Sequence, residues 1–302
     1  IFSAPIYTSS TVIVLFIIFG AFFLRSGAGQ FFINLAFVLV GKIRGGPALG
    51  SVVSSAMIGT ITGNGAANVA ITGSFTIPMM KKIGFPSRHA AAIESVASQG
   101  GQIMPPIMGA SIFIMAELTG IPYIELITYA LIPALIYFMI AALMVYLQAR
   151  KLGLTGLPAE QIPVMSVVIK QLYYFIPIVT IVWLLVMGYS PAMAGMVSIF
   201  VTLALSYVTK ETRMNWKHIL GALEDAARGS MIVVAACAGA GIIVGVVNLT
   251  GIGIRFYRIA IYIAGDNLLL LLFLVMIASI ILGLGMPTVS AYVILAVLAA
   301  PV

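Results

Sequence analysis

Long stretches without a charged residue alternate with short clusters of Lys and Arg along this chain. A charged side chain at the centre of a bilayer costs several kcal/mol, so charge-free stretches of about 20 residues predict membrane-crossing helices. We therefore predict an all-α integral membrane protein. The charge-free stretches cover residues 1–24, 45–80, 95–116, 126–149, 171–209, 229–254 and 267–302.

Two of these stretches are each interrupted by a glycine-rich break. The break runs from Gly59 to Gly65 in the first stretch and from Gly283 to Thr288 in the second. The arms beside each break hold about 15–18 residues, or about 22–27 Å of helix, which is short for a hydrocarbon core of about 30 Å. The sequence therefore predicts two re-entrant helical hairpins, over 47–80 and 267–302.

Composition and charge exclude a water-soluble globular protein. The chain is 62% hydrophobic and 8% charged, against about 45–50% and about 25% in soluble domains. The net charge of +7 does not indicate nucleic acid, because the basic residues flank the apolar stretches and favour a lipid bilayer as the partner. With 6–24 running from outside to inside, thirteen of the 15 basic residues lie inside, as the positive-inside rule expects.

The two predicted hairpins follow a Gly-x-Gly motif at the same distance. The separation is 30 positions from Gly29 to Gly59 and also 30 from Gly253 to Gly283. Each half has the order span, Gly-x-Gly, short amphipathic helix and broken hairpin, and the two halves start on opposite sides. Chance is the alternative, because glycine is common here. We interpret the pattern as an inverted repeat, which is typical of secondary transporters with binding sites near the midplane.

The expected organisation has three parts. A first repeat covers 1–118 and ends in a broken helix over 89–118, connecting transmembrane helices cover 119–220, and a second repeat covers 221–302 and is truncated in its hairpin. Both ends of the sequence resemble cuts within a longer reading frame. The connecting part is expected to hold spans over 122–149, 164–187 and 191–208.

The first glycine-rich break carries the densest group of polar residues. Asn64 and Asn68 are four positions apart, so on a helix that opens near Gly65 they are expected to share one side. Main-chain N–H groups at a helix start suit a carboxylate, and carbonyl groups at a helix end suit a cation. We interpret the break as a ligand site. The alternative is ordinary hydrogen bonding between membrane helices.

A second interruption follows at Gly100-Gly101 and Pro105-Pro106. Glycine weakens a helix and proline removes a donor, so the freed carbonyls and the nearby Gln side chains are candidate ligands. A packing kink is the alternative. Glu94 lies six residues after Arg88; we favour solvation at the membrane interface for it over a role in proton coupling.

In the second hairpin, Pro287 suits the first turn of a helix, so the preceding arm is expected to end near Gly285. Carbonyls freed there, with the Thr288 hydroxyl, suit a monovalent cation; the alternative is that Thr288 only caps the helix. The candidate substrate-binding residues are Thr62, Asn64, Gly65, Asn68, Gln99, Gly100, Gln102, Pro105, Pro287 and Ser290, and the candidate cation ligands are Gly63, Asn64, Gly101, Gly285 and Thr288.

These segments resemble a known family. Thr62–Asn68 with Ile77-Pro78, then Gly84-Phe85 and Ser98–Pro106, are similar to the hairpin motifs of the large membrane (permease) subunit of TRAP transporters, in particular the fused TAXI type. The sequence departs from the serine-rich branch of that family at Asn64, Gly65 and Asn68.

The resemblance implies a secondary transporter that works by an elevator movement without ATP hydrolysis. An extracytoplasmic solute-binding protein would deliver a small organic acid, and a Na⁺ or H⁺ gradient would drive its uptake across a bacterial or archaeal inner membrane. A small membrane subunit, fused ahead of the large one, would brace the scaffold. No cofactor is implied.

Two other classes remain open beside this symporter. A channel or another permease class is one, although the sequence has no nucleotide-binding Gly-x4-Gly-Lys-[Ser/Thr] loop. An intramembrane enzyme is the other, although the sequence has no His-Glu-x-x-His motif, and its two histidines and single cysteine do not suggest a metal cluster. We therefore do not expect an enzyme.

Overall fold

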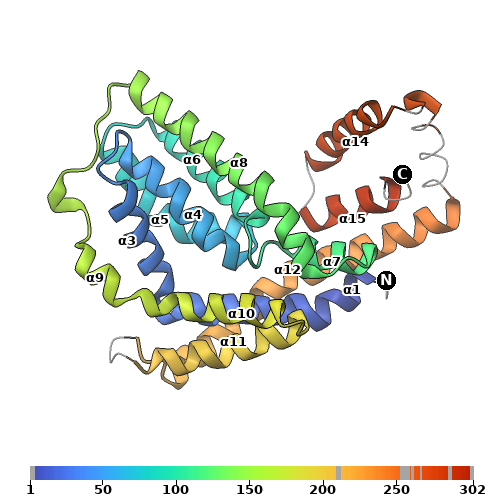
Figure 1. Ribbon diagram of the computed structural model, residues 1–302, viewed down its shortest axis with the longest axis horizontal. Helices are drawn as coiled ribbons and strands as arrows, with labels where there is room; N and C mark the ends of the chain where they lie inside the picture. Colours follow the sequence, from blue (N-terminus) through green and yellow to red (C-terminus); the bar gives the residue numbers. More distant parts are fainter. Residues whose placement is uncertain are drawn as a thin grey trace. The chain divides into compact units, whose positions relative to one another are not determined.

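The computed structural model describes residues 4–208, 212–251, 259, 262–265, 267–284 and 288–299, and the regular structure in them is helical (Figure 1). The chain divides into two compact units. Unit 1 comprises 1–14, 110–121 and 228–302, and unit 2 comprises 15–109 and 122–227. The predicted all-helical class is confirmed.

Unit 2 contains the first predicted hairpin and most of the connecting helices. Its helices are α2 (Val14–Phe23), α3 (Gly29–Val40), α4 (Gly46–Thr62), α5 (Gly65–Lys82), α6 (Ser87–Gly100), α8 (Tyr123–Lys151), α9 (Met165–Lys170), α10 (Ile176–Val186) and α11 (Pro191–Ser206). The helices of unit 1 are α1 (Ala4–Thr8), α7 (Ala110–Thr119), α14 (Leu268–Gly283) and α15 (Thr288–Ala299), and α12 (Trp216–Thr250) begins in unit 2 and continues into unit 1.

Three helical segments are long and apolar enough to cross a membrane among the described residues: Pro5–Val40, Tyr123–Lys151 and Trp216–Val246. The first of them bends at Gly27, whose φ of 97° lies in the left-handed region. That bend separates the first span from α3, which occupies the place of the expected amphipathic helix.

The span expected over 164–187 is not straight. The segments Ala159–Lys170 and Leu172–Val186 meet at an angle of 68°. The tight 3-10 turn Leu172–Phe175 follows the bend, and Pro177 sits in the first turn of α10, where its missing N–H is tolerated. The expected division between α10 and α11 is confirmed; the Ser190 hydroxyl accepts a hydrogen bond from Met193 N and begins α11.

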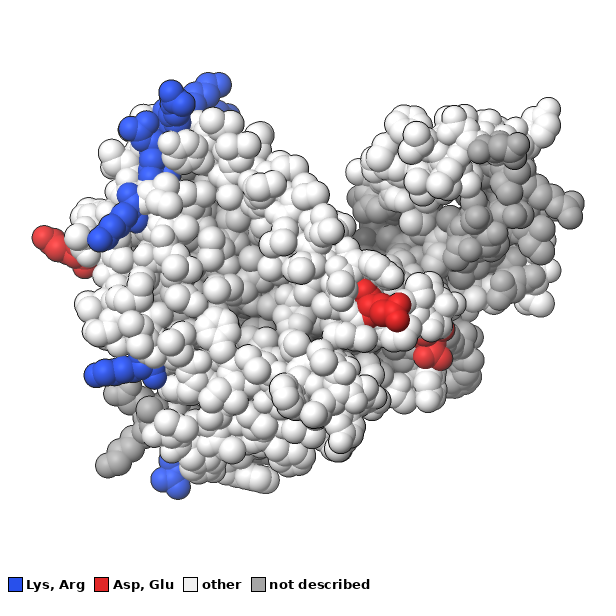
Figure 2. Space-filling view, viewed as in Figure 1, with Lys and Arg blue, Asp and Glu red and all other residues white. Residues whose placement is uncertain are grey.

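Helices α4 and α5 form a helix–break–helix hairpin that packs against α3, α6 and α8. A buried apolar cluster at its open end includes Met80 and Phe85, with Ala149 from α8. The Gly45 N–H donates to Thr155 O, which joins the start of α4 to the segment after α8. These contacts gather the basic ends of the helices at one end of unit 2 (Figure 2): Lys42, Arg44, Lys81, Lys82, Arg88, Arg150 and Lys151 are all exposed there.

Unit 1 contains the second predicted hairpin. Helices α14 and α15 pack on each other, and α15 also contacts α7. Asn267 begins α14 by accepting hydrogen bonds from Leu269 N and Leu270 N. The break between α14 and α15 includes 285–287, which lie outside the described residues.

Candidate binding site at a helix break

The break between α4 and α5 is confined to Gly63 and Asn64. Gly63 takes a left-handed conformation (φ 58°) and its N–H donates to Gly59 O at 2.9 Å, which closes α4. Asn64 is extended, and its side chain accepts a hydrogen bond from Ala67 N at 3.1 Å, which caps α5. The interruption is therefore shorter than the glycine-rich run predicted, because α4 continues to Thr62.

Asn64 and Asn68 do not share one side of a helix, contrary to our expectation. Asn64 precedes the helix as its cap, so the four-residue spacing rule does not apply to it. Asn68 is fully buried, and its Nδ2 donates to Ser55 O on α4 at 2.9 Å and to Ser98 O on α6 at 3.4 Å. Asn68 thus links three helices behind the break, and Asn64 shapes the break itself.

Close main-chain packing holds the end of α6 against this hairpin. A Cβ atom on Gly59 would lie under 3.0 Å from both Gly101 Cα and Asn68 Nδ2, and a Cβ atom on Gly101 would meet Gly59 in the same way. Gly100 is enclosed by the ring of Tyr137, whose hydroxyl donates to Val96 O at 2.7 Å. The two interruptions that the sequence predicts separately therefore lie side by side.

The Gln side chains of the second interruption reach the break. A Cβ atom on Gly65 would lie 2.6 Å from Gln99 Oε1, and Gln102 Nε2 donates to Gln99 Oε1. Thr62 is half-buried, and its hydroxyl lies 3.5 Å from Gly59 O. The candidates Thr62 to Asn68 and Gln99 to Gln102 thus form one group of main-chain and amide groups.

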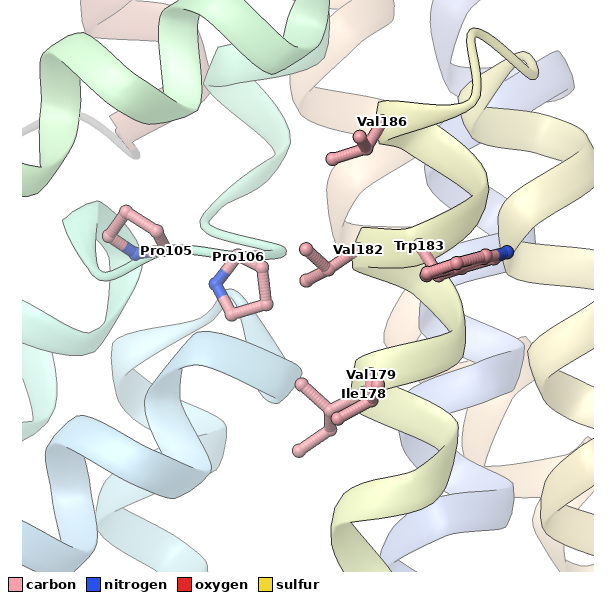
Figure 3. Close-up of a pocket in the computed structure, with 7 residues that line it drawn as sticks. All are labelled: Pro105, Pro106, Ile178, Val179, Val182, Trp183 and Val186. Carbon is pink, nitrogen blue, oxygen red and sulfur yellow. The ribbon is translucent and has the colours of Figure 1, made fainter.

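Pro105 and Pro106 lie in the turn that follows. The hydroxyl of Tyr123, at the start of α8, donates to Ile107 O at 2.6 Å and fixes this turn. Both prolines face α10 across an apolar cavity of about 390 Å³ (Figure 3). Its other lining residues are Ile178, Val179, Val182, Trp183 and Val186. This lining offers no charged group to a carboxylate. The polar break between α4 and α5 is therefore a better candidate than this cavity for the substrate-binding site.

Glu94 is fully buried, and our preference for interfacial solvation was wrong. Helix α6 begins at Ser87, so a rise of 1.5 Å per residue carries Glu94 about 10 Å along it from the basic end. The carboxyl group meets five hydroxyl groups from α4, α5 and α6. They belong to Ser51 (2.7 Å), Ser55 (3.4 Å), Thr72, Thr76 and Ser98 (3.1 Å).

Sequence reasoning missed these hydroxyl residues, although a signal was present. Ser51 and Ser55, Thr72 and Thr76, and Glu94 and Ser98 are pairs four positions apart, which places each pair on one face of its helix. Such pairs on three adjacent helices predict a shared polar contact. We name Glu94 and these five residues the hydroxyl cage.

The candidates in the second hairpin belong to unit 1. Gly285 and Pro287 lie outside the described residues. Thr288 begins α15 and is exposed, and the Ser290 hydroxyl lies 3.4 Å from Ala236 O on α12 as a weak donor. The structure therefore brings the candidates of the first hairpin together within unit 2.

Apolar helices around a broken hairpin, with main-chain and amide groups gathered at the break, are typical of multi-pass membrane transport proteins. The chain belongs to the family described as "Tripartite ATP-independent periplasmic transporter, DctM component", which matches residues 3–302. It is thus a TRAP transporter large permease of the bacterial inner membrane and not an enzyme.

Three relatives illustrate the similarity. The chain is 29% identical over 143 residues to the C4-dicarboxylate TRAP transporter large permease protein of Pseudomonas aeruginosa, which covers 47% of this chain and 33% of that protein. It is 25% identical over 293 residues to a Haemophilus influenzae protein described as a TRAP transporter large permease, covering 93% and 66%. It is 36% identical over 91 residues to the isethionate TRAP transporter permease protein of Oleidesulfovibrio alaskensis, covering 30% and 14%. The chain thus spans less than two thirds of the length of these relatives.

Proposed function

We propose that this chain is the transport-carrying part of an ion-gradient-driven importer for a small organic acid that carries a carboxylate or sulfonate group. The names of two relatives, which specify C4-dicarboxylates and isethionate, support an organic anion. An extracytoplasmic solute-binding protein delivers the solute, and a small membrane subunit, fused to the permease as in the TAXI type, completes the transporter. The three-part name of the family supports both partners.

The observation that carries the proposal is the meeting of two helix interruptions at one place. The first N–H groups of α5, at Gly65 and Ala66, have no acceptor in the preceding turn and suit an anionic oxygen. The carbonyls that end α4 suit a cation, because the helix dipole places partial negative charge there. Buried Asn68 Oδ1 and Thr60 Oγ1 have no hydrogen-bond partner among the described residues. Both atoms are therefore available to form hydrogen bonds with a ligand.

We further propose that the two hairpins are re-entrant and related by an inverted repeat, as an elevator-type carrier requires. Support comes from an offset of 224 positions, which relates Gly29 to Gly253 in the sequence. The same offset relates Gly27 to Gly251, and both have positive φ (97° and 64°). It also maps the start of α5 to within one residue of the start of α15.

Uptake into proteoliposomes tests the proposal. The full-length transporter is reconstituted with its solute-binding protein, and radiolabelled succinate and isethionate are supplied under imposed Na⁺ or pH gradients. We expect uptake of at least one of the two anions that needs both a gradient and the binding protein. Uptake that is independent of the imposed Na⁺ and pH gradients would indicate a channel. A requirement for ATP would indicate another permease class.

A further inference from the structure

The hydroxyl cage is a site without an assigned role in substrate binding. Glu94 is 0% exposed, and so are the side chains of Ser51, Ser55, Thr72, Thr76 and Ser98. Among the described residues, no Lys, Arg or His nitrogen lies within ion-pair distance of the Glu94 carboxyl; the described ion pair joins Arg25 to Asp225. A buried carboxylate without a cation is costly unless hydrogen bonds satisfy it.

The charged groups of the surrounding helices lie at their ends. Helix α4 has no titratable side chain, and the cationic residues of α5 are Lys81 and Lys82 in its last turn. Helix α6 has Arg88 and His89 in its first turn, about 9 Å of helix rise below Glu94. Helix α8 packs on α6, and its titratable residues are Tyr123, Glu125, Tyr129, Tyr137, Tyr146, Arg150 and Lys151.

The heavy-atom positions of the cage allow hydrogen bonds to the Glu94 carboxyl group in both its ionised and its protonated form. Thr72 Oγ1 is within hydrogen-bond reach of Glu94 Oε1 and also lies 2.8 Å from Asn68 O. Thr76 Oγ1 is within reach of Glu94 Oε2 and also lies 3.0 Å from Thr72 O. Each hydroxyl has a single hydrogen, so it can satisfy only one of its two neighbours at a time.

When Glu94 is ionised, the hydroxyls of Ser51 and Thr76 donate to Oε2, and those of Thr72 and Ser98 donate to Oε1. When Glu94 carries a proton, one Thr hydroxyl turns to its main-chain carbonyl and accepts the new O–H of the carboxyl group. Both arrangements leave every polar atom of the carboxyl group with a partner. Rotation of one hydroxyl converts the first arrangement into the second.

We infer that Glu94 and its hydroxyl cage form a proton-binding site. A proton from water forms an O–H bond with one carboxyl oxygen, and release breaks that bond and returns the proton to water. The cage is joined to the helix break by Asn68, whose carbonyl is the alternative acceptor for Thr72 and whose Nδ2 binds Ser55 O. The consequence for transport rests on the proposed function, in which the proton is then an ion that the carrier binds.

Infrared difference spectroscopy on the full-length transporter tests proton binding without any substrate. Spectra at acidic and alkaline pH are compared for the wild type, Glu94→Gln and Glu125→Gln, since Glu125 is an exposed carboxyl of the same unit. We expect the C=O band of a buried protonated carboxyl group to appear on acidification in the wild type and in Glu125→Gln and to be absent from Glu94→Gln. The same band in folded Glu94→Gln would overturn the inference, as would its absence from the wild type.

A second variant keeps the carboxyl group in case Glu94→Gln does not fold. Ser51→Ala removes one hydrogen-bond donor to Oε2, so the frequency of the C=O band should change. An unchanged frequency would contradict the role of the cage.

Uptake under an imposed pH gradient tests the consequence for transport. Glu94→Gln should lower uptake driven by that gradient at least tenfold, and unchanged uptake would overturn the coupling role. Wild-type protein that takes up neither anion under any gradient would count against the proposed function, whereas the infrared result on Glu94 would still stand.

Discussion

The two helical hairpins, α4–α5 and α14–α15, each consist of two helices that pack on each other, but they differ in their surroundings. Thirteen of the 17 residues of α4 are buried, including Ser51, Ser54 and Ser55. Helix α14 instead exposes large apolar side chains, among them Leu269 (77%) and Ile281 (64%). A broken hairpin therefore does not itself require a polar interior. The polar residues behind the first break are an additional feature, which we associate with binding.

Labelling from each side of the membrane gives the largest expected contrast. In a cysteine-free, full-length background, Lys82→Cys at the open end of the first hairpin should react only from the cytoplasmic side. Leu268→Cys at the open end of the second should react only from the outside. Both positions are exposed, whereas Ser51 is fully buried and does not serve as a reporter. Reaction of both from the same face would rule out the inverted arrangement.

Glycine-to-alanine substitutions compare the packing of the two hairpins at positions related by the offset of 224. Gly59→Ala places a Cβ atom against the Gly101 main chain and should lower the free energy of unfolding by about 1–3 kcal/mol. Gly283→Ala meets no atom within 4 Å and should be neutral or stabilise by up to about 1 kcal/mol. Thermal unfolding in detergent measures both changes, and equal effects would contradict the packing difference.

Two asparagine caps offer a smaller contrast. Asn64 caps α5 and Asn267 caps α14 through comparable hydrogen bonds. Replacement by Ala should cost about 1 kcal/mol of stability in each case. If the first break binds the solute, only Asn64→Ala should also weaken succinate or isethionate uptake. Equal uptake by the two variants would mean that Asn64 is only a helix cap.

The smallest effect is expected at the exposed start of α15. Thr288→Val should change the free energy of unfolding by no more than about 0.5 kcal/mol. If the Thr288 hydroxyl binds the coupling cation, the Na⁺ concentration for half-maximal uptake should rise about two- to tenfold, which is at most about 1.4 kcal/mol. Thr119→Val, at an exposed threonine of the same unit, controls for loss of a hydroxyl group. Uptake driven by protons alone would show that the cation assignment is wrong.

The sequence identified the helices and the place of the first break, because charge-free stretches and glycine-rich runs are local signals. It could not place Gly59 against Gly101, because that contact joins two segments that only tertiary packing brings together. Glu94 was misjudged for a similar reason. Its distance from Arg88 along the chain suggested the interface, but the direction of α6 carries it into the hairpin. The bend before α10 lies between Lys170 and Leu172, where no glycine or proline marks it in the sequence.

The contact of Gly59 with Gly101 has a mechanical consequence. No side chain separates the two main chains, so no change of rotamer can absorb a shift between α4 and α6. Asn68 spans the same contact with hydrogen bonds to both helices. Helices α4, α5 and α6 therefore behave as a single stiff piece. If the proposed transport cycle displaces the break, we expect the movement at the margins of this piece, for example at Gly45, whose left-handed conformation precedes α4.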